Sequence, residues 1–439
     1  MNADLLTRFL TFLDHSPTPW HAVATAAAAL DAAGFSELDE GAAPSPLHPG
    51  HLGYLRRGGT ILAFRIGGAP IEEAGIRLVS AHTDSPNLRV KPQPALYEKG
   101  YVRLGVEVYG GVLQATWTDR DLGLAGQVFV RDSRPGFRGQ RGVLVDLRRP
   151  ICRIPNLAIH LNRAVNDEGL KLNPQTQLPA VFALGEKGPD PLRALLSADL
   201  GCDPADVLTW DLCLFDLARP TLGGASNEFI FSGRLDNLGS SHAALEGMIA
   251  AATGDLPAAT SVIALFDHEE VGSTTARGAS GRLLASTLER IVRDAALDHA
   301  LPSRGGLGRA MAHSWHISAD MAHAVHPGWP DKHDAQHMPL LNRGPVIKQN
   351  SSQRYGTEAE TAAMLVRLFE AAEVPSQWFV NRADLACGST VGPIVAAQLG
   401  IRTADVGNPM LSMHSAREMG GSADHAWMIA AMRRFLLGF

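Results

Sequence analysis

The sequence predicts an α/β fold interrupted by a β-rich insertion, on three observations. Strand-like and helix-like segments alternate near both ends of the chain, as in βα units. Between these regions, short segments of alternating polarity are separated by Gly, Asp and Pro. At 439 residues, the chain also exceeds what one core usually supports. We therefore expect an α/β catalytic domain over residues 1–92 and 230–439, and an inserted β-rich domain over residues 93–229.

The composition is that of a globular protein, with 45% hydrophobic and 19% charged residues. A net charge of −6 argues against sequence-independent binding to nucleic acid. The N-terminus lacks a basic-then-apolar signal pattern and no run approaches the length of a membrane span, so we expect no membrane association. The cysteines form no CxxC pair and are typical of reduced thiols in a cytoplasmic protein; they are Cys152, Cys202, Cys213 and Cys387.

The first α/β region is predicted to contain helices over 4–15 and 19–33 and strands over 60–66 and 75–81. The second strand runs directly into His82-Thr-Asp84-Ser-Pro86. Residues two apart on an extended segment point to the same side, so His82 could bind a metal while Asp84 orients it or a metal-bound water. Ordinary polar residues in a turn would give the same pattern.

Prolines 92 and 94 introduce the β-rich region, whose expected strands are 102–109, 126–131, 142–147, 157–162 and 208–217. The Arg- and Gly-rich stretch 134–142 is short and isolated, which favours a hairpin loop over an RNA-binding tract. His160 lies at the end of one expected strand, where it could be a packed core histidine or a functional one.

Past residue 227 the βα pattern resumes, and polar residues follow its strands. An apolar strand over 262–267 ends in Asp267-His-Glu269-Glu270, at the edge where open α/β sheets place their ligands. Two adjacent carboxylates repel each other, which suggests that one binds a cation and the other holds a proton. An exposed acidic turn is the alternative. Asp236 precedes a helix over 238–252, where it could equally be an N-cap.

The rest of the chain continues this alternation. A strand over 314–319 ends at Asp320 and is followed by a proline-broken loop that contains His323, His333 and His337. Lys348 lies on an apolar strand over 345–350, and His414 lies in a loop before the last helix. The other expected elements are helices over 278–300, 357–372 and 424–437 and strands over 376–380 and 401–406.

Five metal-binding side chains thus follow strands or occupy turns of the two α/β regions: His82, Asp236, Glu270, Asp320 and His414. Imidazoles and carboxylates together suit one or two ions of Zn²⁺, Co²⁺ or Mn²⁺. Asp236 could bridge two ions, as in two-metal hydrolases. Glu269 could then accept a proton from the attacking water and pass it to a leaving amine.

Six motifs carry a resemblance to the M18 aspartyl aminopeptidases, in the order and spacing of that family and over nearly the whole chain. They are Ser80-Ala-His-Thr-Asp-Ser-Pro86, Arg234-Leu-Asp-Asn237, Asp267-His-Glu-Glu-Val-Gly-Ser273, Ser318-Ala-Asp-Met-Ala-His-Ala-Val-His-Pro327, Gly344-Pro-Val-Ile-Lys348 and Met413-His-Ser-Ala-Arg-Glu418. The resemblance implies a zinc-exopeptidase-like mixed sheet flanked by helices, with the β-rich insertion serving dimerisation and larger assembly into a tetrahedral homododecamer.

The resemblance also implies a cytoplasmic enzyme with two Zn²⁺ per subunit that releases N-terminal Asp or Glu from peptides. His82, Asp236, Glu270, Asp320 and His414 would hold the metals, Asp84 would support His82, and Glu269 would be the base. Lys348 would face the acidic side chain of the substrate, although it could also extend to the surface. His160 would reach the active site of a neighbouring subunit, and His323 and Tyr355 would line the substrate pocket.

Three alternatives to this function stay open. The same site could serve a broad-specificity aminopeptidase, which the ammonium of Lys348 argues against. It could serve a dinuclear amidohydrolase or deacylase that does not act on peptides. The chain could also be a non-catalytic scaffold on a peptidase fold, which the presence of Glu269 and all five expected ligands argues against.

Overall fold

The computed structural model describes residues 3–134, 139–297 and 306–439. The chain folds into two compact units. The first unit comprises residues 1–84, 220–413 and 418–439, and the second comprises residues 85–219 with the short segment 414–417. The second unit thus begins eight residues before the expected insertion and also takes in His414.

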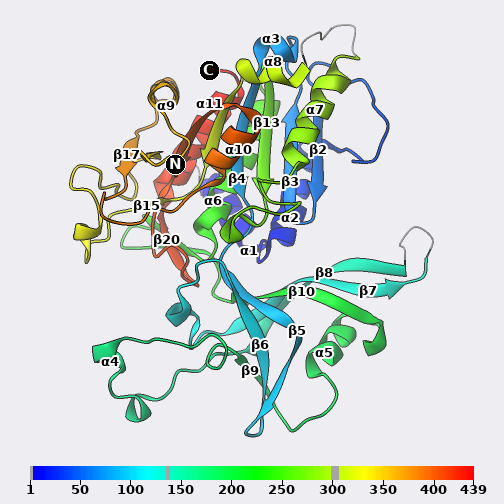
Figure 1. Ribbon diagram of the computed structural model, residues 1–439, viewed down its shortest axis with the longest axis vertical. Helices are drawn as coiled ribbons and strands as arrows, with labels where there is room; N and C mark the ends of the chain where they lie inside the picture. Colours follow the sequence, from blue (N-terminus) through cyan, green and yellow to red (C-terminus); the bar gives the residue numbers. More distant parts are fainter. Residues whose placement is uncertain (1–2, 135–138, 298–305) are drawn as a thin grey trace. The chain divides into compact units, whose positions relative to one another are not determined.

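The first unit is built on a nine-stranded mixed sheet (Figure 1). Its central strands β13, β4, β14 and β18 run parallel, whereas β3 pairs antiparallel to β13 and β16 pairs antiparallel to β18. The strands, in spatial order, are β1 (Ser36–Glu37), β2 (Leu52–Arg57), β3 (Thr60–Arg65), β13 (Thr260–Phe266), β4 (Ile76–His82), β14 (Trp315–Ala319), β18 (Arg402–Gly407), β16 (Val346–Gln349) and β17 (Gln377–Val380).

Both faces of this sheet are buried, because alternate strand residues enter two separate cores. Ile263 and Leu265 of β13 pack into one core, and Val262 and Ala264 pack into the other. The first core contains α1 (Ala3–Asp14), α2 (Pro19–Ala32), α6 (Leu235–Ala252), α9 (Ala359–Ala371) and α11 (Ser422–Leu436). The second contains α3 (Ile71–Ala74), α7 (Leu283–Ala295), α8 (Gly306–Ala312) and α10 (Val391–Leu399).

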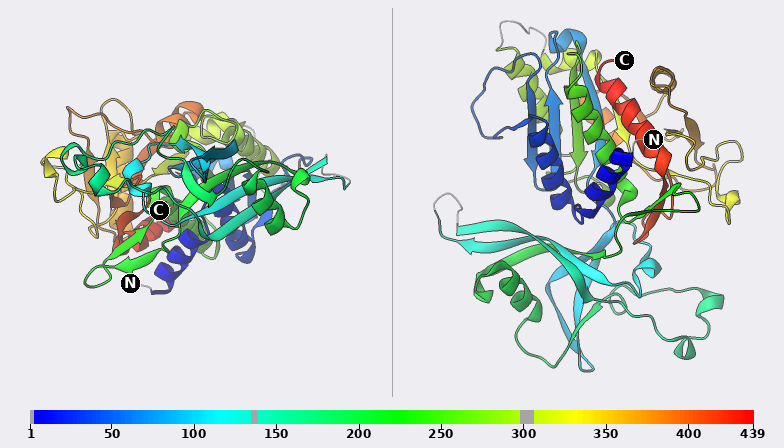
Figure 2. Two further views of the ribbon diagram at one scale, coloured as in Figure 1. Left: turned by 90° about the horizontal axis from the view of Figure 1, so that it is seen from below. Right: turned by 180° about the vertical axis from the view of Figure 1, so that it is seen from behind.

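Two views show this layering. Figure 1 has α7 and α10 in front of the strands, and the rear view in Figure 2 has the blue N-terminal helices and the red α11 in front. Helices on both faces explain why the central strands are continuously apolar rather than alternating. The predicted mixed α/β fold is therefore confirmed.

A smaller five-stranded sheet completes the first unit. Its strands, in spatial order, are β11 (Thr221–Gly223), β12 (Phe229–Ser232), β20 (Glu418–Gly421), β19 (Pro409–Leu411) and β15 (Ala322–His323). The parallel pairing of β15 with β19 places Ala322 opposite Pro409 and His323 opposite Met410.

The second unit contains a six-stranded antiparallel sheet with its own apolar core. Its strands, in spatial order, are β8 (Gly139–Cys152), β7 (Leu122–Asp132), β10 (Val207–Asp216), β5 (Asn87–Glu98), β6 (Tyr101–Tyr109) and β9 (Ala180–Leu184). Two short helices, α4 (Val165–Glu168) and α5 (Pro191–Leu200), lie between β8 and β10 along the chain.

The expected strand over 157–162 is wrong. This segment contains a single 3-10 turn at Ile159–Leu161, and Leu157 and Leu161 are 60% and 74% exposed. The apolar pattern therefore has no neighbouring strand to pair with among the described residues. The possibility that His160 is a packed core histidine is also wrong, because its side chain is exposed.

The prolines at 92 and 94 lie within β5 rather than before the strands. The β5–β6 ladder shifts register between Val90 and Ala95, around the residues that lack a backbone N–H. The segment 134–142 connects β7 to β8, but residues 135–138 of the expected hairpin loop lie outside the described residues. Across the described part of the chain, no helix combines the length and apolar character needed to cross a bilayer.

Candidate active site

Three parallel strands of the nine-stranded sheet end beside one another and deliver four of the predicted site residues. His82 is the last residue of β4, Asp320 directly follows β14, and Glu269 and Glu270 lie on a 3-10 turn, η4 (Glu269–Val271), after β13. Because β13, β4 and β14 are parallel neighbours, their carboxyl ends meet at one edge of the sheet.

Asp236 reaches the same place from the start of α6. Its backbone is extended, with φ −84° and ψ 105°, so regular helix begins only after Asn237. Its amide N–H donates to Oε2 of Glu418 across 3.2 Å, and Glu418 is buried in β20. Glu418 was not among the predicted site residues; its position at the end of the last motif, 413–418, was its only signal in the sequence.

His82 lies at the centre of a group of carboxylates. Its Nε2 is 3.4 Å from Oδ1 of Asp236, 3.6 Å from Oδ1 of Asp320 and 3.9 Å from Oε2 of Glu269. The imidazole is 1% exposed. Because water is largely excluded from this buried ring, its electrostatic interactions with the carboxylates are stronger than they would be at the surface.

Asp84 connects the end of β4 to the turn that carries the two glutamates. Oδ1 of Asp84 lies 3.4 Å from Nδ1 of His82, and the backbone carbonyl oxygen of Asp84 lies 3.0 Å from the same nitrogen. Its two carboxylate oxygens accept the amide N–H groups of Glu269 and Glu270, each across 3.1 Å. One buried carboxylate thus orients the histidine and the glutamate pair together.

The donor set fits a divalent cation. His82, Asp236 and Glu270 each offer one ligand atom, and these three atoms lie within 4.8 Å of one another. The Asp320 carboxylate, close to the same His82 ring nitrogen, can add a further oxygen. Zn²⁺ accepts both imidazole nitrogen and carboxylate oxygen as ligands, so these residues can hold it.

The pKa values of this group show an excess of negative charge. Burial raises the pKa of Glu269 to about 8; His82 opposes this shift, and the nearby aspartates increase it. Burial also raises the pKa of Glu270 well above its usual value, with Asp236 adding to the effect. Burial acts to lower the pKa of His82, but its carboxylate partners raise it overall. A bound cation would offset this repulsion.

Lys348 lies on β16 and is 2% exposed, so the alternative that it extends to the surface is wrong. Its Nζ donates to the carbonyl of Met321 across 3.2 Å and lies 3.8 Å from Oδ2 of Asp320. The same ammonium lies 5.0 Å from the ring centre of Tyr355. The lysine therefore lies immediately beside an expected metal ligand.

His323 on β15 lines a cavity of about 310 Å³ within the first unit. Other walls of the cavity come from His333, Phe379 and Met413. The rings of His323 and Tyr355 both approach Phe379, with centres 5.8 and 6.4 Å away. Burial lowers the pKa of His323, and the nearby Lys348 lowers it further. The cavity therefore combines apolar walls with neutral imidazole.

His414 and His160 belong to the second unit. Nδ1 of His414 lies 3.0 Å from the carbonyl oxygen of Gly111 in that unit, and His160 lies on the exposed turn η2 (Ile159–Leu161). The expected metal-binding role of His414 and the expected contact of His160 with a neighbouring subunit stay predictions.

Comparison with known proteins identifies the family. The sequence profile described as "Aminopeptidase I zinc metalloprotease (M18)" matches residues 12–436. A protein of Stutzerimonas stutzeri (strain A1501) named "Probable M18 family aminopeptidase 2" is 46% identical over 445 residues, covering 99% of this chain and 98% of its own length. A Pseudomonas aeruginosa protein (strain UCBPP-PA14) of the same name is 46% identical over 440 residues, with the same coverage.

Solved structures agree over the whole chain. Ape4 in its cryo-EM complex with Nbr1 superposes with a TM-score of 0.92 at 37% identity, covering 99% of this chain and 86% of Ape4. The mApe1 dodecamer of S. cerevisiae superposes with a TM-score of 0.82 at 28% identity, covering 98% of this chain and 96% of that one. The chain therefore belongs to the M18 family of zinc metalloproteases and is a metallo-aminopeptidase.

Proposed function

We propose that this protein removes unblocked N-terminal Asp and Glu residues from peptides, with two Zn²⁺ ions per subunit and Glu269 as general base. The observation that carries the proposal is the arrangement of one imidazole, several carboxylates and a partly buried glutamate at a single sheet edge. His82, Asp236, Glu270, Asp320 and His414 would hold the ions, with Asp236 between them. Co²⁺ and Mn²⁺ suit the same ligands.

A divalent cation bound there would polarise the scissile carbonyl and acidify a water molecule. Its positive charge would also keep Glu269 ionised at neutral pH, against the effect of burial. Glu269 then accepts a proton from the attacking water and delivers it to the leaving amine. Asp84 holds the amides of Glu269 and Glu270, so that the base and its neighbouring ligand keep a constant relative position.

Selectivity for acidic residues would come from Lys348. Its ammonium is buried, with the carbonyl of Met321 and the carboxylate of Asp320 as its near neighbours. A substrate carboxylate would add a second negative charge beside this buried ammonium, whereas a neutral side chain would add none. His323 and Tyr355 would shape the pocket around that side chain.

We also propose that the protein self-associates into a tetrahedral homododecamer in the cytoplasm. Exposed leucines of the second unit, at 157, 161 and 184, support burial against other subunits. The dodecameric form of the similar yeast mApe1 supports the same assembly. The four cysteines are free, as is usual in reducing compartments.

Hydrolysis of a panel of anilides by the purified protein tests this function. We expect turnover of Asp- and Glu-p-nitroanilide, little turnover of Leu-p-nitroanilide, and none of N-acetyl-Asp-p-nitroanilide. Extended chelation, with metal removal verified by elemental analysis, should abolish activity, and Zn²⁺, Co²⁺ or Mn²⁺ should restore it.

Each arm of the panel can fail separately. Full activity after verified metal removal would exclude the metal-dependent mechanism. Equal rates on Asp- and Leu-anilide would replace acidic selectivity with broad specificity. Release of acetate rather than p-nitroaniline from the acetylated substrate would indicate a deacylase.

A further inference from the structure

The turn that carries Glu269 and Glu270 is held on two sides. On one side, Asp84 accepts both of their amide N–H groups. On the other side lie the residues that immediately precede the turn and a loop that follows it. Their side chains form a network of Asp267, His268, Thr275 and Arg277, which we call the turn clamp.

Arg277 is the centre of the turn clamp. Its Nε lies 3.4 Å from Oδ2 of Asp267, which is fully buried at the end of β13. Its Nη2 lies 3.0 Å from Nε2 of His268. Its backbone carbonyl accepts the hydroxyl of Thr60 from the neighbouring strand β3 across 2.7 Å. One guanidinium thus joins the strand end to the residue directly before Glu269.

The chemistry of the guanidinium also assigns the protonation of His268. Arginine has donors only, so Nε2 of His268 must accept from Arg277. The ring proton then resides on Nδ1, which donates to Oγ1 of Thr275 across 2.8 Å. That hydroxyl oxygen also accepts the amide N–H of Gly278 across 3.0 Å. A neutral His268 of one tautomer therefore joins the residue before the turn to Thr275 and Arg277 in the loop after it.

The turn needs this support because its own backbone is short. It comprises one 3-10 turn between His268 and Gly272, both of which have left-handed φ, at 64° and 94°. Glu269 and Glu270 are adjacent in the sequence, yet the proposed mechanism gives their side chains different roles. Asp84 restrains their amides, and the clamp restrains the chain direction on entry through Asp267 and His268.

We propose that Arg277 is a positioning residue for the reaction: through Asp267 and His268 it sets the placement of Glu269 as base and Glu270 as metal ligand. The inference rests on the proposed roles of those glutamates. Outer partners that orient metal ligands typically contribute about 10- to 100-fold to affinity or rate, and the clamp belongs to this class.

The test compares the parent with Arg277→Ala, Arg277→Lys and the matched control Arg282→Ala. Arg282 lies on the same segment, but its side chain is 81% exposed and pairs with Glu289. For Arg277→Ala, we expect kcat on Asp-p-nitroanilide to fall about 10- to 100-fold with little change in KM, and Zn²⁺ to bind more weakly in a metal titration. Arg282→Ala should match the parent in all three quantities.

Two further readouts separate positioning from simple stabilisation. Millimolar guanidinium chloride should restore part of the kcat of Arg277→Ala, whereas equal sodium chloride should not. The kcat of Arg277→Lys should lie between those of the parent and the alanine variant. A lysine keeps the positive charge but lacks the planar guanidinium that reaches both Asp267 and His268. If the alanine variant does not fold, the lysine variant carries the test.

A parental kcat and Zn²⁺ affinity in folded, metal-loaded Arg277→Ala, or in the lysine variant in its place, would overturn the proposal. So would a lowered Tm as the only change. Failure of this proposal can be told apart from failure of the proposed function. If Glu269→Gln keeps the parental kcat, Glu269 is not the base. The Zn²⁺ titration of the Arg277 variants would still report whether Arg277 positions Glu270.

Discussion

At the residue scale, Glu269 and Glu270 are neighbours with the same side chain and different surroundings. Glu270 can offer an oxygen that groups with those of His82 and Asp236, whereas Glu269 lies 3.9 Å from His82 at the edge of the cluster. Burial and the nearby carboxylates raise the pKa of both. Glu270, the proposed metal ligand, and Glu269, the proposed base, therefore differ in where their carboxylates lie and not in the chemistry of the side chain.

Glu269→Gln should therefore lower kcat by about 10²- to 10⁴-fold, the usual contribution of a general base, because an amide cannot accept the proton. Bound metal, measured by elemental analysis, should stay at the parental level. Glu270→Gln serves as the comparison and should lose metal as well as rate. Parental turnover in metal-loaded Glu269→Gln would exclude it as the base.

Lys348→Met should reduce kcat/KM on Asp-p-nitroanilide by about 10- to 150-fold, the value of one charge-assisted hydrogen bond. The rate on Leu-p-nitroanilide should be kept or improved, because a neutral side chain forms no ion pair with Lys348 and would meet an apolar side chain in its place. Lys348 also lies 3.8 Å from Asp320, so metal content must be measured in the same samples. An unchanged ratio of the two rates would move selectivity to other residues, with His323 and Tyr355 the next to test.

At the scale of elements, α6 and α11 share a buried pair of histidines. Nδ1 of His242 lies 2.9 Å from Nε2 of His425, and the ring of Phe9 stacks on His425 at 3.7 Å. Burial lowers the pKa of His242 to about 3, with Arg8 adding to the effect. Burial also lowers the pKa of His425, and His242 reinforces that shift. Both rings therefore stay neutral in the folded protein.

This pair should make the protein sensitive to mild acid. In the unfolded chain, histidines take up protons near a pH of about 6.5, whereas in the folded protein His242 and His425 do not. The contribution of the neutral pair to the unfolding free energy is therefore fully present above that pH and is lost as the pH falls below it. The loss is up to about 1.4 kcal/mol per pH unit for each histidine. His425→Phe should flatten the decrease in unfolding free energy between about pH 6.5 and pH 5, measured by urea denaturation.

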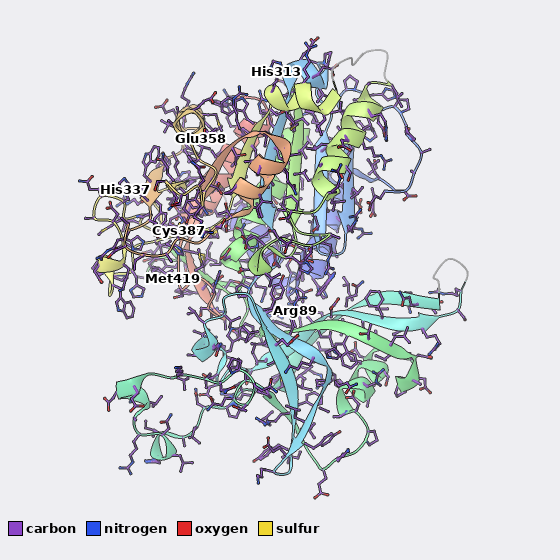
Figure 3. The ribbon with its side chains drawn as sticks, viewed as in Figure 1. Arg89, His313, His337, Glu358, Cys387 and Met419 are labelled. Atoms are coloured by element: carbon purple, nitrogen blue, oxygen red, sulfur yellow. The ribbon has the colours of Figure 1, made fainter. Side chains whose placement is uncertain are left out.

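The same variant should be less stable at neutral pH by about 1–3 kcal/mol, because His242 loses a buried hydrogen-bond partner. His313→Gln is the control: His313 is exposed after α8, and Figure 3 labels it there. It should keep the parental pH dependence. An equally steep decrease in His425→Phe would remove the histidine pair as the cause.

At the scale of the whole molecule, the proposed assembly makes a prediction about pairs of inactive subunits. If His160 serves a neighbour's active site, a His160→Ala subunit retains Glu269 and a Glu269→Gln subunit retains His160. Mixed oligomers would then contain sites with both residues. Co-expression of the two variants should restore activity that neither homo-oligomer shows.

Co-expression of Glu269→Gln with Asp236→Ala is the matched control, because both changes affect the proposed metal site of their own subunit. Every site in such a mixed oligomer lacks one of the two residues, so this pair should stay inactive. Parental activity in a His160→Ala homo-oligomer, or in a protein that sediments as a monomer, would contradict the assembly proposal.

The sequence alone determined where the chemistry-bearing residues lie along the chain. His82 and Asp320 follow apolar strands, and Asp236 precedes a helix, because these patterns depend on neighbours only a few residues away. The order of parallel strands then brings their ends together. The mixed α/β fold was predictable for the same reason, as were the approximate bounds of the strands that end at His82 and Asp320.

Only the tertiary structure decided which groups support them. Glu418 contacts Asp236 across 182 residues of sequence, and Asp84 contacts Glu269 across 185. The buried ammonium of Lys348 contacts Met321 and Asp320, which lie between β14 and β15. Residues 157–162 are apolar like a strand, yet they are exposed because no partner strand in the described ranges of the chain reaches them. Such contacts depend on how distant segments pack, and local periodicity carries no record of that packing.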